Sequence, residues 1–295
     1  MTVTTFLGAT VAVQALFLCL DLADRHATRA RRYDGERLRA SSLVFLLLVI
    51  AAFLAIQLAG FALVPRVDGL VDWIRTHVAR RPSTVAPPGG WRLAVVGAGI
   101  FYLAGLVDYA WHRWFSHHRW FWFTHESHHL PTQVFVGMPG LGVRPFAVVT
   151  VIPLVAFTAM LTYGALRLAG RPMWNWTVFQ LPLLLSSTLL VTSHSSFMRR
   201  GWWAHRVFRC LTLTTPQEHV LHHTTDLQGN YGNFTTIWDR LFGTYLDPRL
   251  PEHQNKRYGL AYDQDFLGAV TAGAVKLPAS WRKRFQLDRY INIDR

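Results

Sequence analysis

The chain has 295 residues, of which 51% are hydrophobic and only 16% are charged, against about 25% charged in ordinary soluble domains. Its formal charge of +13 would suit nucleic acid or an anionic membrane surface, but it has no zinc-finger spacing or RNP-like aromatic run, so we expect no nucleic-acid partner. Two cysteines, Cys19 and Cys210, are too few for a disulfide framework or a cysteine-based zinc site.

Five apolar segments are each close to the roughly 20 residues that a helix needs to cross a bilayer. They cover residues 4–20, 41–64, 93–110, 146–169 and 173–193. The first lacks a positive leading region and a small-residue cleavage site, so we interpret it as a retained membrane anchor that ends at Asp21. A loop rich in Pro and Gly, 78–90, precedes the third segment. Beyond the fifth the chain is largely polar, and 266–277 could form an interfacial helix.

The distribution of basic residues orients these segments. With five crossings, 23 of the 30 Lys and Arg residues fall on one side, which we predict to be cytoplasmic, with the N-terminus outside and the C-terminus inside. The expected fold class is all-α, with multi-pass membrane helices and a cytoplasmic, helical, histidine-rich cap. We divide the chain into N-terminal membrane helices and linker (1–91), a catalytic domain (92–250) and a polar C-terminal tail with the candidate interfacial helix (251–295).

Two of the histidine groups repeat one spacing. The runs HESHH (125–129) and HVLHH (219–223) each place histidines at i, i+3 and i+4, which share a helix face, so each run could present three imidazoles to one point. His112 and His117 are five residues apart, about 140° around an ideal helix, so they share a face only if the helix ends or bulges between them. All these groups, with His194, fall on the predicted cytoplasmic side.

This number of histidines favours a metal site, with two metal ions ahead of one. Neutral imidazole binds iron, copper, zinc and nickel. One alternative reads HESHH as the HExxH pattern of a membrane metalloprotease, with Glu126 as the general base, but it leaves His128 and the second run unexplained. Another alternative, a metal transporter, would place histidines within the spanning segments, whereas here they lie just beyond the segment ends.

Several carboxylates could orient the ligating histidines, which usually donate their second ring N–H to a carboxylate or carbonyl. Asp108 lies one turn before His112, and Asp226 and Asp239 follow the last histidine run. A salt bridge to Arg240 or Arg249 would explain Asp239 equally well. Glu126 and Glu218 stand beside candidate ligands and are either supporting groups or solvated. The isolated His26, His77 and His253 receive no role, and the roles of His118 and His205 stay open.

Beyond these spacings, two longer motifs carry a family resemblance. The histidine order HxxxxH, HxxHH, HxxHH resembles that of membrane di-iron desaturases and hydroxylases. The run NYGNFTTIWDRLFGTYLDP, 230–248, and TPQEHVLHH before it resemble the sterol desaturase branch of the fatty acid hydroxylase superfamily. HESHH alone is also similar to carotene hydroxylases. The resemblance covers roughly residues 108–248.

Carried over by position, the resemblance implies nine metal ligands. They are His112, His117, His125, His128, His129, His194, His219, His222 and His223. Many bacterial relatives have three residues between the first two histidines; that spacing would fall on Ser116 here, so His117 or His118 must serve. Some relatives have a further histidine four residues after the His194 position, where this chain has Met198.

The resemblance also implies a mechanism. Two iron ions, which zinc could replace, would use O2 and electrons from an external donor to attack an unactivated C–H bond of a lipid in the bilayer. The sequence shows no haem, flavin or iron–sulfur motif, so a separate reductase or electron carrier is expected as a partner. We expect hydroxylation, with desaturation at the same site as the alternative, in an integral membrane protein with its catalytic side cytoplasmic.

Overall fold

A computed structural model describes residues 3–28, 66, 69–70, 72–74, 76–77, 91–122, 125, 129, 176–200, 203–226, 228–258 and 280. This part of the chain is helical and contains no strand, which confirms the all-α expectation for these residues. Its only β-type pairings are two isolated bridges, Leu213 with Thr235 and Thr224 with Tyr258. The expected segments 41–64 and 146–169 and the candidate interfacial helix 266–277 lie outside the described residues.

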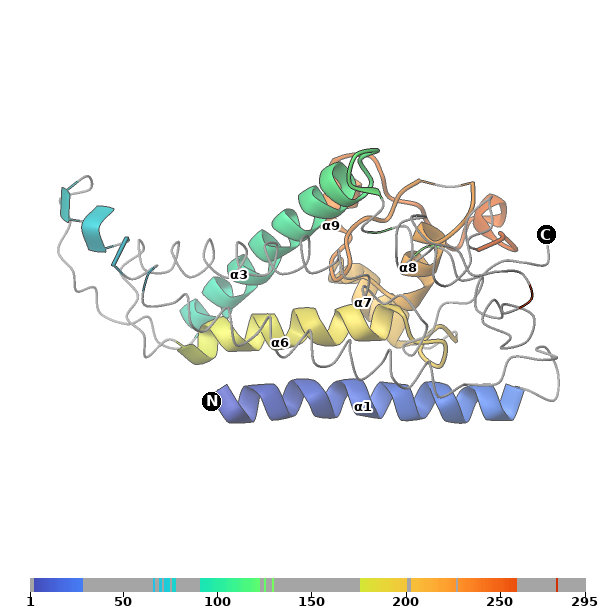
Figure 1. Cartoon of the computed structure of the whole chain (residues 1–295), viewed down its shortest axis with the longest axis horizontal. Helices are drawn as coiled ribbons and strands as arrows, with labels where there is room; N and C mark the ends of the chain where they lie inside the picture. The colour runs from blue at the N-terminus through green and yellow to red at the C-terminus, as the bar shows by residue number, and fades with distance from the viewer. Residues whose placement is uncertain are drawn as a thin grey trace.

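Three long helices carry the described part of the fold: α1 (Val3–Thr28), α3 (Trp91–Ala110) and α6 (Trp176–Ser193). Helix α6 packs against both α1 and α3. Figure 1 shows that all three run in the same direction, so that their C-terminal ends point toward the end of the molecule where the short helices lie. This common direction agrees with the expectation that the first, third and fifth segments cross in the same sense.

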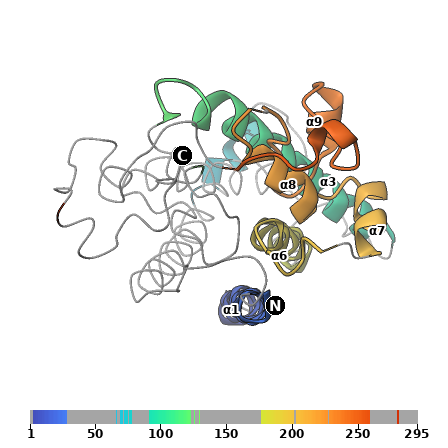
Figure 2. The same ribbon diagram turned by 90° about the vertical axis from the view of Figure 1, so that its right-hand side faces the viewer.

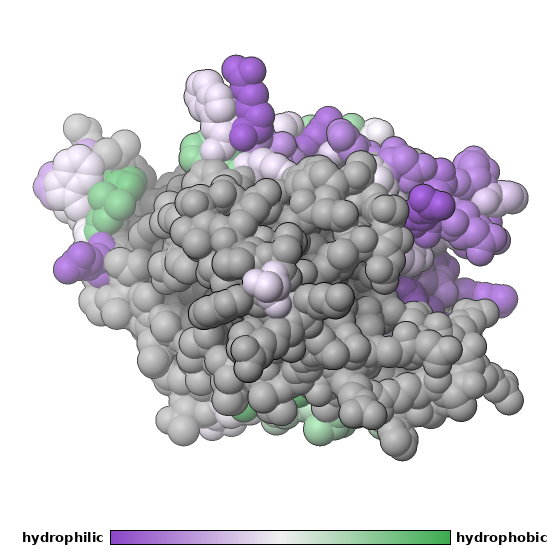
Figure 3. Space-filling model, turned by 45° about the vertical axis from the view of Figure 1, so that its right-hand side comes forward, coloured by the Kyte–Doolittle hydropathy of each residue, from purple (hydrophilic) through white to green (hydrophobic). Residues whose placement is uncertain are grey.

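One described helix is long and apolar enough to cross a membrane, judged by length and composition alone. It covers Ala94–Ser116, which joins most of α3 to the π-helix η2 (Trp111–Ser116). Figure 3 shows hydrophilic residues gathered at the right-hand edge of the described surface, with hydrophobic residues at its lower edge and in smaller patches at its left and upper edges. The number of crossings and the side on which the histidines lie stay predictions.

The first helix is longer than the sequence predicts. Helix α1 continues past Asp21 to Thr28 because that carboxylate is buried and bonded instead of solvated. The Ser195 hydroxyl donates to it at 2.5 Å, and the backbone N–H groups of Ser196 and Phe197 donate at 3.2 and 3.1 Å. The charge therefore does not end the helix. It ties α1 to the turn that follows α6.

The short helices form a cap at the C-terminal ends of α3 and α6. They are α7 (Ala204–Cys210), α8 (Pro216–His222), α9 (Ile237–Leu241) and the 3-10 turn η5 (Pro251–His253). Helix α8 packs on α6 and α9 on α3, as Figures 1 and 2 show. Between them lies a small apolar core of Phe101, Ala104, Leu189 and Phe234.

The contact between α3 and the segment before α9 requires a glycine. A Cβ on Gly105 would lie 2.4 Å from the Thr235 Cγ2 atom and 3.3 Å from the Trp238 indole nitrogen. That nitrogen donates to the Tyr102 carbonyl at 2.9 Å, one turn earlier on α3. The absence of a side chain at Gly105 thus lets the cap approach the long helix closely.

We expect Gly105→Ala to destabilise the protein by about 1–3 kcal/mol, the usual cost of overpacking a well-filled contact. Gly99→Ala, in the same helix, is the matched control, since a Cβ there meets nothing within 4 Å and alanine favours helix. Thermal unfolding of both variants in detergent measures the difference. Equal melting temperatures would show that the cap does not depend on this close approach.

Candidate metal centre

A π-helical turn brings the first two candidate ligands together. In η2 the backbone N–H of His117 donates to the His112 carbonyl at 3.1 Å, an i→i+5 bond. The chain therefore makes one turn between residues that an ideal α-helix would separate by about 140°. The imidazole centroids of His112 and His117 lie 5.1 Å apart. This is the bulge that the two histidines need in order to share a face. It makes His117 the candidate ligand, since the neighbouring His118 lies outside both histidine clusters.

Five imidazoles from three parts of the chain form the first histidine cluster. They belong to His112, His117, His125, His129 and His222, and one ring nitrogen of each lies within 4.8 Å of the others. The Nε2 atoms of His112 and His125 are 2.9 Å apart, and those of His117 and His222 are 3.2 Å apart. For metal–nitrogen bonds of about 2.1 Å, ligands at right angles lie about 3.0 Å apart. The spacing thus fits donors around one ion.

His194, His219 and His223 form the second histidine cluster. Their Nε2 atoms are separated by 2.9 Å between His194 and His219 and by 3.2 Å between His219 and His223. The two clusters adjoin each other, because the His129 ring of the first stacks on the His223 ring of the second with centroids 4.7 Å apart. Two ions held here would be neighbours.

The HVLHH run divides between the two clusters, so it does not present three imidazoles to one point as its spacing suggested. At 100° per residue, His222 and His223 point about 100° apart around α8, whereas His219 and His223 are only about 40° apart. His222 therefore reaches the first cluster, while His219 and His223 reach the second. One helix turn supplies both candidate metal positions.

Backbone carbonyls fix the protonation of three of these rings. Nδ1 of His112 donates to the Tyr231 carbonyl at 2.5 Å, and Nδ1 of His222 to that of Gly229 at 2.9 Å. In the second cluster, Nδ1 of His194 donates to the Leu190 carbonyl at 2.9 Å. Because a carbonyl only accepts, the ring proton sits on Nδ1, and the Nε2 lone pair points into the cluster. Such converging lone pairs are the donor set that a metal cation needs.

Burial keeps the rings neutral, and therefore able to bind metal, near pH 7. Burial lowers the pKa of His194 to about 4. Burial, together with the repulsion that a protonated His112 would exert, lowers the pKa of His117 to about 2. The pKa values of His129 and His222 also lie well below their usual range, because both rings are buried and face other histidines.

The loop that supplies two of these carbonyls is itself held by two carboxylates, the buried Asp239 and the partly buried Asp108. Asp239 accepts from the backbone N–H groups of Tyr231 and Gly232 at 2.8 and 2.9 Å. Asp108 accepts from the backbone and side-chain N–H groups of Asn233 at 2.9 and 2.8 Å. Neither carboxylate takes the His112 proton directly. Both were expected to support the ligands, and in the structure both contact residues 231–233 of the carbonyl loop.

The supporting role of residues 229–233 could not be predicted from their side chains, because main-chain carbonyls accept the hydrogen bonds from the histidine rings. The only sequence signal was the NYGNF motif itself. A Cβ on Gly232 would lie 2.0 Å from the Thr235 carbonyl oxygen, and one on Gly229 would lie 2.4 Å from that of Thr244. Asn230, with a positive φ of 51°, accepts from the Leu246 N–H at 2.8 Å and donates to the carbonyls of Glu218 and Leu246 at 2.9 Å.

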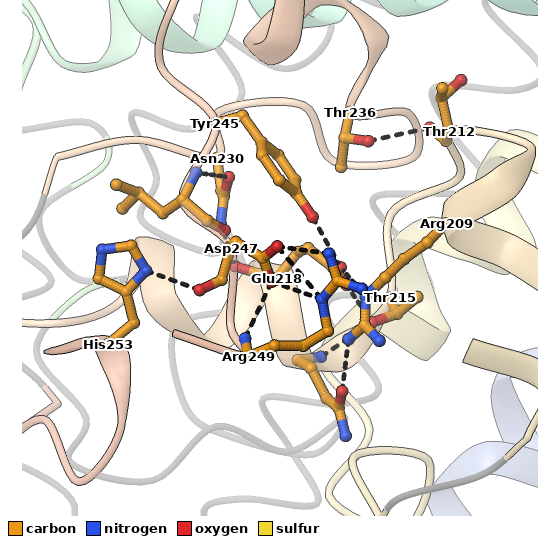
Figure 4. Close-up of polar contacts among 12 residues, drawn as sticks. Arg209, Thr212, Thr215, Glu218, Asn230, Thr236, Tyr245, Asp247, Arg249 and His253 are labelled. Carbon is orange, nitrogen blue, oxygen red and sulfur yellow. Dashed lines mark hydrogen bonds and ion pairs between the residues drawn. The ribbon is translucent and has the colours of Figure 1, made fainter. Parts of the chain in front are cut away.

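Helix α8 is fixed by a buried ion pair, drawn in Figure 4. Glu218 is fully buried, pairs with Arg209 of α7, and accepts from the hydroxyls of Thr215 and Tyr245. Thr215 also caps the helix, since its hydroxyl accepts from the Gln217 N–H at 3.2 Å. The interpretation of Glu218 as a solvated residue is therefore wrong. Its contacts set the position of α8 and hence of His219 and His222.

The structure corrects other expectations about single residues. Asp226 is exposed and pairs with Lys256 at 2.8 Å, so it does not support a ligand. Asp239 pairs with neither Arg240 nor Arg249, and Arg249 binds Asp247 instead. His205 is buried on α7 but belongs to neither cluster. Candidate ligand His128 and the alternative base Glu126 lie outside the described residues.

The two aspartates that follow the last histidine run give a matched pair of variants. Asp239→Asn should weaken metal binding by roughly 10–100-fold, because the amide cannot accept from both backbone N–H groups that hold the loop. Asp226→Asn makes the same chemical change at the surface and should leave metal affinity unchanged. Competition with a chelator measures both affinities. Equal affinities would mean that the carboxylate of Asp239 does not hold the site.

The low pKa values predict the pH dependence of the metal-free protein. In the unfolded chain His194 binds a proton below its ordinary pKa of 6.5, whereas in the folded protein the buried ring binds one only below about pH 4. The free energy of unfolding should therefore fall as pH falls from 6.5 toward 4, by on the order of 1.4 kcal/mol per pH unit for each such histidine.

Thermal unfolding of the chelator-treated protein at pH 7.5 and pH 5 tests this dependence. His194→Gln should weaken it, and His118→Ala, which changes a ring outside both clusters, should leave it intact. Unchanged or greater stability at pH 5 would contradict the assignment of neutral buried rings.

No solved structure matches the chain. The family model described as "Fatty acid hydroxylase" matches residues 97–244, half of the chain, and this stretch holds both histidine clusters and the loop that supports them. The family comprises membrane-associated oxidoreductases of the fatty acid hydroxylase and sterol desaturase type. The chain belongs to the fatty acid hydroxylase family.

Proposed function

We propose that this protein is a membrane-bound, non-haem di-iron oxygenase that hydroxylates an unactivated C–H bond of a lipid. The observation that carries the proposal is the pair of adjoining histidine clusters, with ring nitrogens 2.9–3.2 Å apart, in a chain of this family. The family is usually iron-dependent, which favours iron over zinc as the resident ion.

The two clusters would hold one iron ion each. The five imidazoles of the first cluster and the three of the second are the candidate ligands, and His128 is a further candidate from outside the described residues. Iron bound there would supply the O2 activation and hydrogen abstraction that no side chain can perform on an alkane. Electrons would come from a separate reductase or electron carrier.

The protein's own groups prepare the site for this chemistry. The carbonyls of Tyr231 and Gly229 keep protons on Nδ1 of His112 and His222, so that the Nε2 atoms are available. Burial keeps the rings neutral and limits access of water, which protects an oxidising centre from side reactions. The rigid contacts of Asp239 and Asp108 hold the carbonyl loop in place.

The alternatives explain less. A HExxH protease would use His125 and His129 as two of three zinc ligands and leave a position open for water. Here His112, His117 and His222 lie in the same cluster, which favours a more fully coordinated ion. A metal transporter would carry its histidines along a transmembrane path. These rings instead gather around the C-terminal ends of the long described helices. Desaturation shares the first hydrogen abstraction and stays the second candidate reaction.

Metal analysis joined to lipid mass spectrometry tests the proposal. Protein made in iron-supplemented cells should hold about two ions per chain. His222→Ala and His219→Ala, one from each cluster, should each lower iron content and abolish turnover, whereas His118→Ala should retain both. Cells that contain the active enzyme and a reductase should show a lipid class heavier by one oxygen.

Each part of this experiment can fail separately. About one metal ion per chain, unchanged in His222→Ala, would count against a dinuclear site. A lipid lighter by two hydrogens would replace hydroxylation with desaturation. If no lipid changes although iron is loaded and a reductase is supplied, the lipid-oxygenase assignment is wrong.

A further inference from the structure

Helix α7 has the reverse of the polarity expected for a helix that faces water. Its buried face carries His205, which is 2% exposed, and Arg209, which pairs with buried Glu218. Its outward face carries Trp203, Val207 and Leu211, which are 76%, 45% and 54% exposed. These three residues stand four apart, at the N-cap, middle and C-cap of the helix, so they form a stripe within about 80° of arc.

Although α7 belongs to the cap, its apolar stripe lies alongside the candidate membrane span, at the level of Tyr102. The carbonyl of Leu211 accepts from the Tyr102 hydroxyl at 2.7 Å. Tyr102 lies within the apolar stretch Ala94–Ser116 and eight residues before the end of α3, which is roughly 12 Å along the helix axis. In Figure 2, α7 lies at the outer edge of the described helices, to the side of α6.

Charge at the edge of the stripe agrees with the same surroundings. Arg206 is exposed one helical turn before Cys210, at the border of the apolar arc. An arginine beside exposed apolar side chains can bind lipid phosphate while the apolar groups enter the acyl region. Exposed tryptophan, as at Trp203, is typical of the boundary between lipid and water.

We propose that the outward face of α7, formed by Trp203, Val207 and Leu211, is a lipid-contacting surface that seats the cap in the bilayer leaflet around α3. The occupant is the lipid bilayer. On the polar buried face, the guanidinium of Arg209 is satisfied by its ion pair with Glu218. Transfer of the apolar outward face from water into lipid is favourable, whereas leaving it exposed to water would be unfavourable. Since Arg209 also contacts α8 through Glu218, the seated helix is directly connected to the helix that bears the candidate ligands His219 and His222.

Fluorescence quenching in lipid nanodiscs tests this surface. In full-length, metal-loaded protein with Cys19→Ser and Cys210→Ser, an environment-sensitive dye is attached at Val207→Cys or Leu211→Cys. Val95→Cys, exposed on the candidate span, is the lipid control, and Glu252→Cys, exposed on η5, is the water control. The nanodiscs contain phosphatidylcholine and phosphatidylglycerol, with a doxyl-labelled lipid as one quencher and iodide as the other.

We expect dye at positions 207 and 211 to behave like dye at 95, with doxyl quenching several-fold stronger than at 252 and iodide quenching several-fold weaker. Iodide quenching as strong as at 252 would overturn the proposal. Protection from both quenchers, with crosslinking between two chains through these positions, would also overturn it, because a second copy would then cover the stripe. Retained metal content shows that each variant folds.

A second measurement leaves α7 unchanged. Native Cys210 is exposed beside the stripe and can be labelled in a Cys19→Ser protein. We expect its dye to be quenched by the doxyl lipid more strongly than dye at 252, and the opposite order would overturn the proposal.

Discussion

The donation of imidazole Nδ1–H groups to backbone carbonyls is the interaction on which the rest of the site depends. Tyr231 and Gly229 supply the carbonyls for His112 and His222, and Leu190 supplies one for His194. Each bond orients a ring and leaves its Nε2 lone pair facing inward. A metal centre built from neutral imidazoles needs that orientation, since a ring turned over would present a proton where the ion should bind.

The cap is arranged around this requirement. Asp239 and Asp108 hold the carbonyl loop by its N–H groups, and Asn230 ties that loop to α8 and to Leu246. The Glu218–Arg209 ion pair holds α8 against α7. Asp21 of α1 holds the turn that follows His194. Most of these groups are buried and polar, so the interior of the cap depends on satisfied hydrogen bonds more than on apolar packing.

This distribution of polarity suits a protein of a membrane-associated family. Charged and polar groups gather inside the cap, around the histidines, while Trp203, Val207 and Leu211 face outward from α7. The apolar contacts of Phe101, Leu189 and Phe234 lie where α3 and α6 meet the cap. Under the proposed function, a lipid substrate would reach the metal centre from the bilayer side without crossing water, which would be the physical advantage of the proposed seating of the cap.

Composition, histidine spacing and the NYGNF motif in the sequence were enough to predict an all-α fold, a family and a set of candidate ligands. Local patterns carry this information because helix periodicity and the spacing of candidate ligands are both visible among residues that are close together in the sequence. Tertiary structure alone decided that η2 bulges to align His117 with His112, that HVLHH divides between two clusters, and that Asp226 lies at the surface. Pairs such as His117 and His222, 105 residues apart, meet only when the end of η2 and helix α8 come together in the fold. Every residue type has a backbone carbonyl, so the sequence could not show that those of residues 229 and 231 accept from the histidine rings. Only the folded path of the backbone shows it.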